Sequence, residues 1–307
     1  MSNQAQIRQE ITAKIIDSLK SGGLPPWRRS WRADGNCGRS CNVISRRNYS
    51  GVNALTLAIA SMRHDFQSKH WGTVNNWNSL GGRIKKRPAD VEAGTWGTKI
   101  IYWQPMSKTK VQDGEERVDQ FFFMKTYHVF NIDQVEGDSI DHLRAGNAPL
   151  SQFDIDNRYE SVEVAINAIP VEIRHGGDRA YYCPSEEYIR LPLRSQFSSL
   201  DHYYETAGHE LVHFSEKPLG WDRKNYSYSM GELVAEIGAC FWCAELGIDT
   251  GEFDQNCSYL KGWLESMAND PKFIFQASAQ ASKAVDYLLS FSRKPEEIEA
   301  SEAELVV

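Results

Sequence analysis

The stretch that decides the fold is His209-Glu210-Leu211-Val212-His213. The two histidines are four residues apart, so on a helix their imidazoles lie on one face, one turn apart. That separation suits two nitrogen ligands of one Zn²⁺ ion, at about 2.0–2.1 Å each. Glu210, directly after the first histidine, would face the open coordination position and act as a general base toward water. The pentapeptide therefore predicts a metal-binding helix of the zinc-metallopeptidase type.

The alternative reading of this pentapeptide is a helix with two surface or capping histidines. The residues around the histidines favour the metal. Ala207, Gly208, Leu211 and Val212 are small or apolar, which predicts a buried helix. Two buried histidines without partners carry a desolvation cost that a bound metal removes.

A third protein ligand is expected from a following helix. Nineteen residues after His213 comes Glu232-Leu233-Val234-Ala235-Glu236, two carboxylates one helical turn apart on an apolar segment. The arrangement resembles the Glu-zincin pattern, in which the first acid is the ligand. We therefore predict His209, His213 and Glu232 as ligands, and Glu236 as the hydrogen-bond partner of a ligand histidine. The reverse assignment of the two acids stays open, and the site also suits Mn²⁺ or another divalent transition metal.

Two further features belong to this hypothesis. The strand predicted at 187–192 contains Pro192, which suits an edge strand that aligns a substrate. Arg223, Tyr226 and Tyr228 are candidate donors to the transition state. An ordinary structural role is the alternative for the strand and for each of the three side chains.

The net charge of −7 is unevenly distributed. Residues 1–135 contain 20 Lys and Arg against 11 Asp and Glu, a net charge of +9. The remainder has 14 basic and 30 acidic residues, a net charge of −16. A basic module can bind a polyanion that an acidic module repels. The split predicts two modules with different partners.

The basic module is also rich in tryptophan. Basic groups bind phosphates and aromatic faces stack on unpaired bases, so this combination favours single-stranded DNA. The candidate DNA-binding residues are Trp27, Arg28, Arg29, Trp31, Arg46, Arg47, Tyr49, Trp71, Trp77, Lys85, Lys86 and Arg87. The alternative is that the tryptophans fill a small core while the charges cover a solvated surface.

Helix and strand patterns occur in both modules, which predicts an α+β protein of two domains. We place a small α/β domain that binds single-stranded DNA at residues 1–140 and a linker at 141–152. A zincin-like metallopeptidase domain follows at 153–293, and an acidic, disordered tail at 294–307. The sequence has no run of eighteen apolar residues and no secretory signal, which favours a cytoplasmic protein without a membrane partner.

Nearly the whole chain resembles the ArdC-type antirestriction proteins of conjugative plasmids and the related N-terminal domains of plasmid primases. The resemblance depends on segments in both modules. These segments are Pro26-Trp27, Asn48-Tyr49-Ser50-Gly51-Val52-Asn53-Ala54-Leu55, Trp71-Gly72-Thr73, Gly81-Gly82, Val129-Phe130-Asn131, Ala180-Tyr181-Tyr182 and the two metal-site motifs.

The resemblance implies an N-terminal domain that binds single-stranded DNA and a C-terminal zincin-like domain. It also implies that the protein shields incoming plasmid DNA from host restriction during conjugation, with an unknown protein substrate, for which the host restriction machinery is a candidate. Two alternatives stay open at this point. One is a passive DNA shield with a structural metal, and the other is a DNA-dependent protease acting on DNA-bound proteins.

Overall fold

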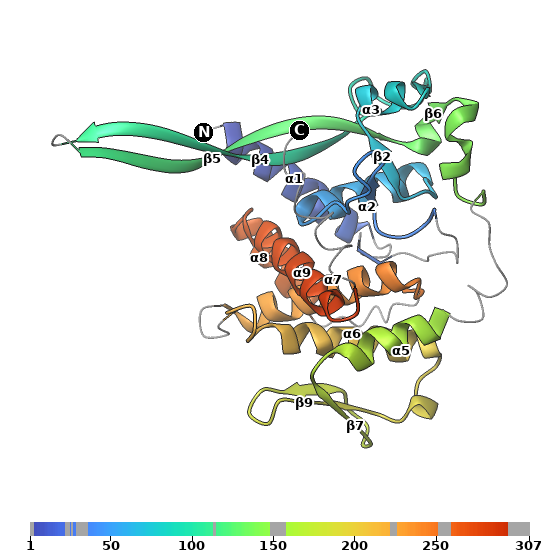
Figure 1. The fold of residues 1–307 in the computed structure, drawn as a ribbon, viewed down its shortest axis with the longest axis vertical. Helices are drawn as coiled ribbons and strands as arrows, with labels where there is room; N and C mark the ends of the chain where they lie inside the picture. Colours follow the sequence, from blue (N-terminus) through green and yellow to red (C-terminus); the bar gives the residue numbers. More distant parts are fainter. Residues whose placement is uncertain are drawn as a thin grey trace.

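The structure is a computed structural model, and it describes residues 3–21, 25, 27–28, 36–112, 115–147, 158–221, 226–250 and 259–293. These residues form helices and strands in both halves of the chain (Figure 1), which confirms the predicted α+β class. Among them, none of the helices has the length and apolarity that crossing a bilayer requires. The acidic tail predicted at 294–307 lies outside the described residues.

The first half is built around a four-stranded sheet in the order β1-β2-β5-β4. Strands β4 and β5 pair antiparallel along their lengths and form a hairpin that projects from the rest of the fold (Figure 1). A second, two-stranded sheet pairs β3 with β6. The elements are α1 (Asn3–Lys20), β1 (Cys41–Asn42), α2 (Val52–His64), β2 (His70–Gly72), α3 (Val74–Ser79), β3 (Arg83–Ile84), β4 (Thr98–Gln112), β5 (Glu115–Asn131), η1 (Ile132–Gln134), β6 (Val135–Glu136) and η2 (Asp138–Leu143).

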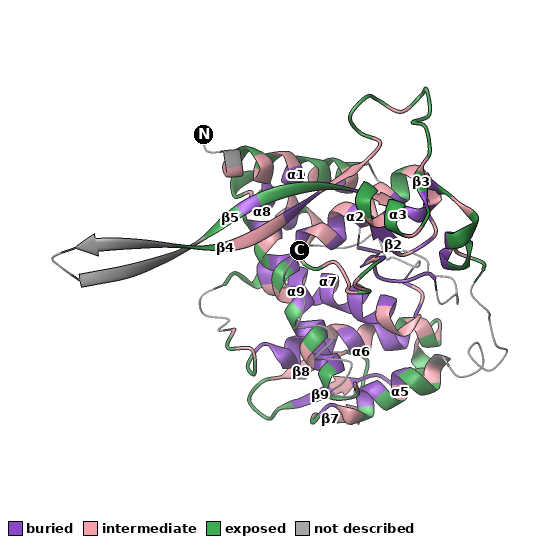
Figure 2. Cartoon of the chain, turned by 45° about the horizontal axis from the view of Figure 1, so that its top comes forward, coloured by how far each residue is buried: buried purple, intermediate pink, exposed green. Residues whose placement is uncertain are grey.

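The second half packs helices against a three-stranded sheet in the order β7-β9-β8. The elements are α5 (Arg158–Ala168), β7 (Glu172–His175), β8 (Tyr181–Cys183), β9 (Tyr188–Leu191), η3 (Arg194–Gln196), α6 (Leu200–Ser215), α7 (Tyr228–Leu246), α8 (Leu260–Asn269) and α9 (Phe273–Ser290). Figure 2 shows buried residues concentrated along α6 and α7, in the middle of this half.

The predicted edge strand at 187–192 is wrong. It is β9, which pairs with β7 on one side and with β8 on the other. Pro192 lies just beyond the last residue of β9, so it blocks no ladder hydrogen bond and does not require an edge position. The edge strand next to the metal-site helix is β8, which contacts α6.

The two halves share one hydrophobic core. Ile11, Ile15 and Leu19 of α1 are buried in the same cluster as Trp263 of α8 and the apolar residues of α6 and α7. The spacing of these α1 residues places them on one helix face, and that face lies against the second half. The basic first half and the acidic second half therefore pack together in one continuous core.

The segment predicted as a linker at 141–152 is partly built into the first half. Its first residues continue η2, and Leu143 is buried together with Ile140 in a small cluster around Trp77. Residues 148–152 lie outside the described part of the chain.

Helices α6 and α7 approach closely because each has a glycine at the contact. A Cβ atom added at Gly238 would stand 2.7 Å from Cγ2 of Val212, and one added at Gly208 would stand 2.8 Å from Cδ1 of Trp242. Real contacts are longer than this, so only glycine allows the spacing. Because α6 and α7 bear the candidate metal ligands, this contact sets the distance between those ligands.

We expect Gly238→Ala to lower the free energy of unfolding by about 1–3 kcal/mol, since the added methyl group must displace Val212 in a packed core. Urea unfolding of the purified protein measures the change. Gly231→Ala on the same helix is the matched control. A Cβ at Gly231 meets no atom within 4 Å, so this variant should be as stable as the parent or slightly more stable. Equal stability of both variants would contradict the tight contact.

Candidate metal centre

The two histidines are positioned by α6, which begins with a side-chain cap. Ser199 accepts a hydrogen bond from the backbone N–H of His202, and the helix continues without interruption through the motif. The rings of His209 and His213 stand 5.0 Å apart, centroid to centroid. His213 is buried and His209 is half-buried. The predicted helix therefore places both imidazoles on one face.

The third donor comes from the first turns of α7. Ser227 caps this helix, because its side chain accepts a hydrogen bond from the backbone N–H of Met230. Glu232 faces both histidines. Its Oε2 lies 3.6 Å from Nε2 of His209, and its Oε1 lies 3.7 Å from Nε2 of His213. The three ligand atoms lie within 4.8 Å of one another. The structure thus brings together the three predicted ligands and places Glu232, rather than Glu236, opposite the imidazoles.

These distances fit a divalent metal. Donors about 2.0–2.1 Å from a tetrahedral zinc ion stand roughly 3.3 Å from each other. The observed separations of 3.6 and 3.7 Å need only small side-chain adjustments to reach that value. Two neutral imidazoles and one carboxylate are also the donor set of catalytic zinc sites, which keep one position open.

The pKa values of His209 and Glu232 point the same way. Burial alone lowers the pKa of His209, but the contact with Glu232 and the charges of Glu210 and Glu236 raise it above its ordinary value. Burial raises the pKa of Glu232, yet its contacts with His209 and His213 lower it overall. Both shifts favour an imidazolium–carboxylate pair, and a divalent cation that binds to these groups displaces the proton.

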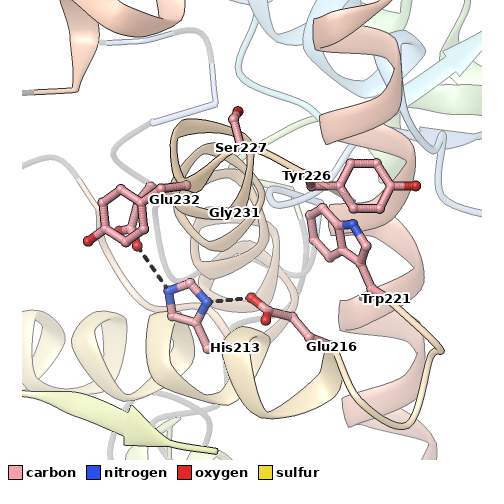
Figure 3. Close-up of a pocket in the computed structure, with 8 residues that line it drawn as sticks. His213, Glu216, Trp221, Tyr226, Ser227, Gly231 and Glu232 are labelled. Atoms are coloured by element: carbon pink, nitrogen blue, oxygen red, sulfur yellow. Dashed lines mark hydrogen bonds and ion pairs between the residues drawn. The ribbon is translucent and has the colours of Figure 1, made fainter. Parts of the chain in front are cut away.

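Sequence reasoning missed Glu216, which lies three residues after His213. Its Oε1 is 2.7 Å from Nδ1 of His213, and both side chains are buried (Figure 3). An Nδ1–H that donates to this carboxylate leaves Nε2 free to bind a metal. An acid three residues after a ligand histidine was a visible signal, since i and i+3 side chains meet on a helix.

We expect Glu216→Ala to weaken metal binding by about 10- to 100-fold, because loss of a hydrogen-bond partner of a ligand histidine usually costs that much. Titration of the metal against a chromophoric chelator measures the affinity. Lys217→Ala is the control, because Lys217 is an exposed neighbour that pairs with Glu187 and not with the histidines. An unchanged affinity in Glu216→Ala would show that this contact does not orient His213.

Glu236 does not have the expected role of binding a ligand histidine. Its Oε1 accepts a hydrogen bond of 2.7 Å from Nε of Arg28, a residue of the first half. Nη2 of Arg28 lies 2.6 Å from Oε1 of Glu205, which precedes His209 by one turn of α6. Burial raises the pKa of Glu205 to about 7, although Arg28 opposes the shift. Arg28 thus compensates two buried carboxylates that flank the ligands along their helices.

The other candidates of the metal site lie around it. Glu210 is buried, and its charge contributes to the raised pKa of His209. The hydroxyl of Tyr228 lies 3.1 Å from the hydroxyl of Tyr259. Tyr226 lines a pocket beside the site, and Arg223 lies outside the described residues.

The candidate DNA-binding residues do not form one surface. Trp27, Trp71 and Trp77 are at most 3% exposed, so their rings have no free face for a base, and stacking by them is not supported. The reason is that these indoles fill the core, as the alternative interpretation held. Arg28 is buried against the two carboxylates. Arg46, Lys85, Lys86 and Arg87 are exposed, Arg47 and Tyr49 are half-buried, and Arg29 and Trp31 lie outside the described residues.

Comparisons with known proteins match each half of the chain. Residues 160–280 match the family of zincin-like metallopeptidases, and residues 5–130 match the N-terminal domain of anti-restriction factor ArdC. The crystal structures of the antirestriction ArdC protein from plasmid R388 are similar to this structure. The metal-free form gives a TM-score of 0.71 at 28% identity and covers 93% of this chain and 97% of that chain. The Mn(II)-bound form gives 0.68 at 27% identity and covers 94% and 98%.

Two further relatives extend the comparison. The protein y4eC of Sinorhizobium fredii is 27% identical over 92% of this chain and 91% of its own length. A DNA primase TraC of Escherichia coli is 30% identical over 96% of this chain, but the match spans only 20% of the primase.

The fold, the site and the family matches define a protein in which a zincin-like metallopeptidase domain follows an N-terminal domain of a different family. The chain belongs to the ArdC family of antirestriction proteins. The resemblance read from the sequence is thereby confirmed.

Proposed function

We propose that this chain protects incoming plasmid DNA from host restriction during conjugation, and that it does so by binding single-stranded DNA and hydrolysing a protein substrate at a zinc site. The observation that carries the hydrolytic part is the convergence of His209, His213 and Glu232, with Glu210 next to them. The match to the anti-restriction factor ArdC, the similar antirestriction protein from plasmid R388 and the similar DNA primase TraC support the biological role.

The residues have distinct tasks in this proposal. His209, His213 and Glu232 hold the metal, and Glu216 fixes the tautomer of His213. When bound, the metal polarises the scissile carbonyl and makes water more acidic. The Glu210 carboxylate accepts a proton from the attacking water and then delivers it to the leaving amine. The burial of Glu210 strengthens its charge interactions in this step.

The test of the hydrolytic part is Glu210→Gln, which keeps the side-chain shape but removes the base. We expect unchanged zinc affinity and a fall in turnover of about 10²- to 10⁴-fold. Protection of transferred DNA in restricting recipient cells should fall with it, and a proteomic comparison of cells with either chain should show which protein is cleaved. Full protection by the variant would rule out proteolysis and leave the passive DNA shield.

The DNA-binding part depends on the exposed cations Arg46, Lys85, Lys86 and Arg87. Replacing residues 85–87 with alanine removes three of these charges. If they contact phosphates, the slope of log affinity against log salt should flatten by about 0.7 for each lost contact. Fluorescence anisotropy with labelled oligonucleotides measures the slope, and Lys261→Ala combined with Lys283→Ala on α8 and α9 is the charge control. An unchanged slope would place the DNA elsewhere.

A further inference from the structure

A pocket of about 140 Å³ opens directly beside the metal ligands. Its lining includes His213, Glu232, Trp221 and Tyr226 (Figure 3), together with Tyr228 and Gly231. The rings of Trp221 and Tyr226 pack edge to face, with centroids 5.0 Å apart. A ligand that reaches the metal therefore meets this pocket next.

Several of the polar side chains that line the pocket have partners within the protein. Glu216 accepts from His213, and Glu232 faces both ligand histidines. The hydroxyl of Tyr228 lies 3.1 Å from the hydroxyl of Tyr259. What remains for an occupant is mainly aromatic surface, which favours an apolar group over a charged one.

Gly231 gives the pocket its depth. It lines the pocket from the second turn of α7, where a Cβ would meet no atom within 4 Å. Close packing therefore does not require glycine here, in contrast to Gly238 on the same helix. A glycine inside a helix costs roughly 0.5–1 kcal/mol relative to alanine, so an open space at this position calls for another reason. We attribute the glycine to the space that its missing side chain leaves beside the metal ligands His213 and Glu232.

The size of the space limits what it accepts. An apolar cavity of roughly 150 Å³ takes up one benzene molecule. A pocket of about 140 Å³ therefore holds a phenyl ring or a branched aliphatic side chain.

We propose that this pocket selects a large apolar side chain, such as leucine or phenylalanine, next to the bond that is cleaved. This inference rests on the proposed peptidase function. It specifies the substrate as a polypeptide segment that exposes such a residue, and it names Gly231 and Trp221 as the residues that determine the preference.

The experiment measures binding rather than turnover. The full-length zinc-loaded chain is titrated by calorimetry with the N-acetyl hydroxamates of alanine, leucine, phenylalanine and lysine. Each probe binds the metal through its hydroxamate and differs only in its side chain. The leucine and phenylalanine probes should bind about 10- to 100-fold more tightly than the alanine probe, because they bury more apolar surface. Equal binding of all probes, or a preference for lysine, would overturn the proposal.

Gly231→Leu fills the pocket from its own wall. In this variant the leucine and phenylalanine probes should bind no better than the alanine probe, while the affinity for zinc is unchanged. Gly231→Ala should give an intermediate preference. Gly262→Leu on α8 is the control, because Gly262 is also a helical glycine and does not line the pocket, and a Cβ there would meet only Oγ of Ser229, at an ordinary contact distance of 3.7 Å. A preference that survives in Gly231→Leu would show that the apolar side chains bind elsewhere.

The outcomes separate the two proposals. If the probes show the preference but no protein is cleaved in cells or in solution, the pocket assignment holds and the peptidase function fails. If turnover occurs without any side-chain preference, the peptidase function holds and the pocket assignment fails.

Discussion

Replacing Arg28 with methionine is expected to lower the free energy of unfolding by about 3–5 kcal/mol, because the substitution leaves buried carboxylates without a counter-charge. Arg28 lies 2.7 Å from Glu236 and 2.6 Å from Glu205. The three side chains are between 9% and 12% exposed, so water cannot replace the guanidinium. Methionine keeps most of the length and the apolar contacts of the arginine side chain. The loss of stability therefore measures the effect of the missing charge.

Urea unfolding measures this effect, and a surface ion pair provides the control. Arg174 pairs with Glu172 and Glu186, but these side chains are 36–63% exposed. Arg174→Met should therefore lower the free energy of unfolding much less than Arg28→Met does. Adding Glu205→Gln and Glu236→Gln to Arg28→Met should recover part of the loss, since amides are cheaper to bury than carboxylates. Equal losses for Arg28→Met and Arg174→Met would contradict the buried network.

The second large effect concerns the ligands themselves. We expect His213→Ala to weaken binding of Zn²⁺ and of Mn²⁺ by more than about 100-fold. Removal of a hydrogen-bond partner of a ligand already costs up to about that much, and this substitution removes a donor atom. It also leaves the buried carboxylate of Glu216 without its imidazole partner. Loss of the metal should remove any hydrolytic activity as well.

Competition against a chelator measures the affinity for each metal. His202→Ala is the matched control, because His202 lies in the first turn of the same helix and is exposed. Glu232→Ala should reproduce the loss, whereas Glu236→Ala should leave the ligand atoms in place. Tight metal binding by His213→Ala would mean that the ion binds elsewhere in the chain.

The sequence predicted the candidate site better than its surroundings. The spacing of His209, His213 and Glu232 is set within two helices, and helix periodicity alone brings such residues to one face. The partner of His213 was predictable on the same grounds, because Glu216 follows it by three residues and such side chains meet on a helix. The partner of Glu236 was out of reach, because Arg28 lies 208 residues earlier and meets it only through tertiary packing.

Amino-acid composition alone does not predict whether a tryptophan binds a base or fills the core. An indole that stacks on a base and an indole that fills a core have the same neighbours in sequence, since both occur among basic and apolar residues. Burial decides between them, and burial of Trp71 and Trp77 depends on strands and helices that converge from distant segments. Exposed charges such as Lys86 are less ambiguous, because a lone lysine is rarely buried.

The shared core has a consequence for how such proteins evolve. A recombination that replaced only the first 130 residues would remove the α1 face from the core around Trp263 and take Arg28 away from Glu205 and Glu236. The two halves are therefore expected to be inherited together, as one cassette. The TraC primases fit this expectation: they match 96% and 93% of this chain within 20% and 27% of their own length, so a much longer protein contains both halves side by side.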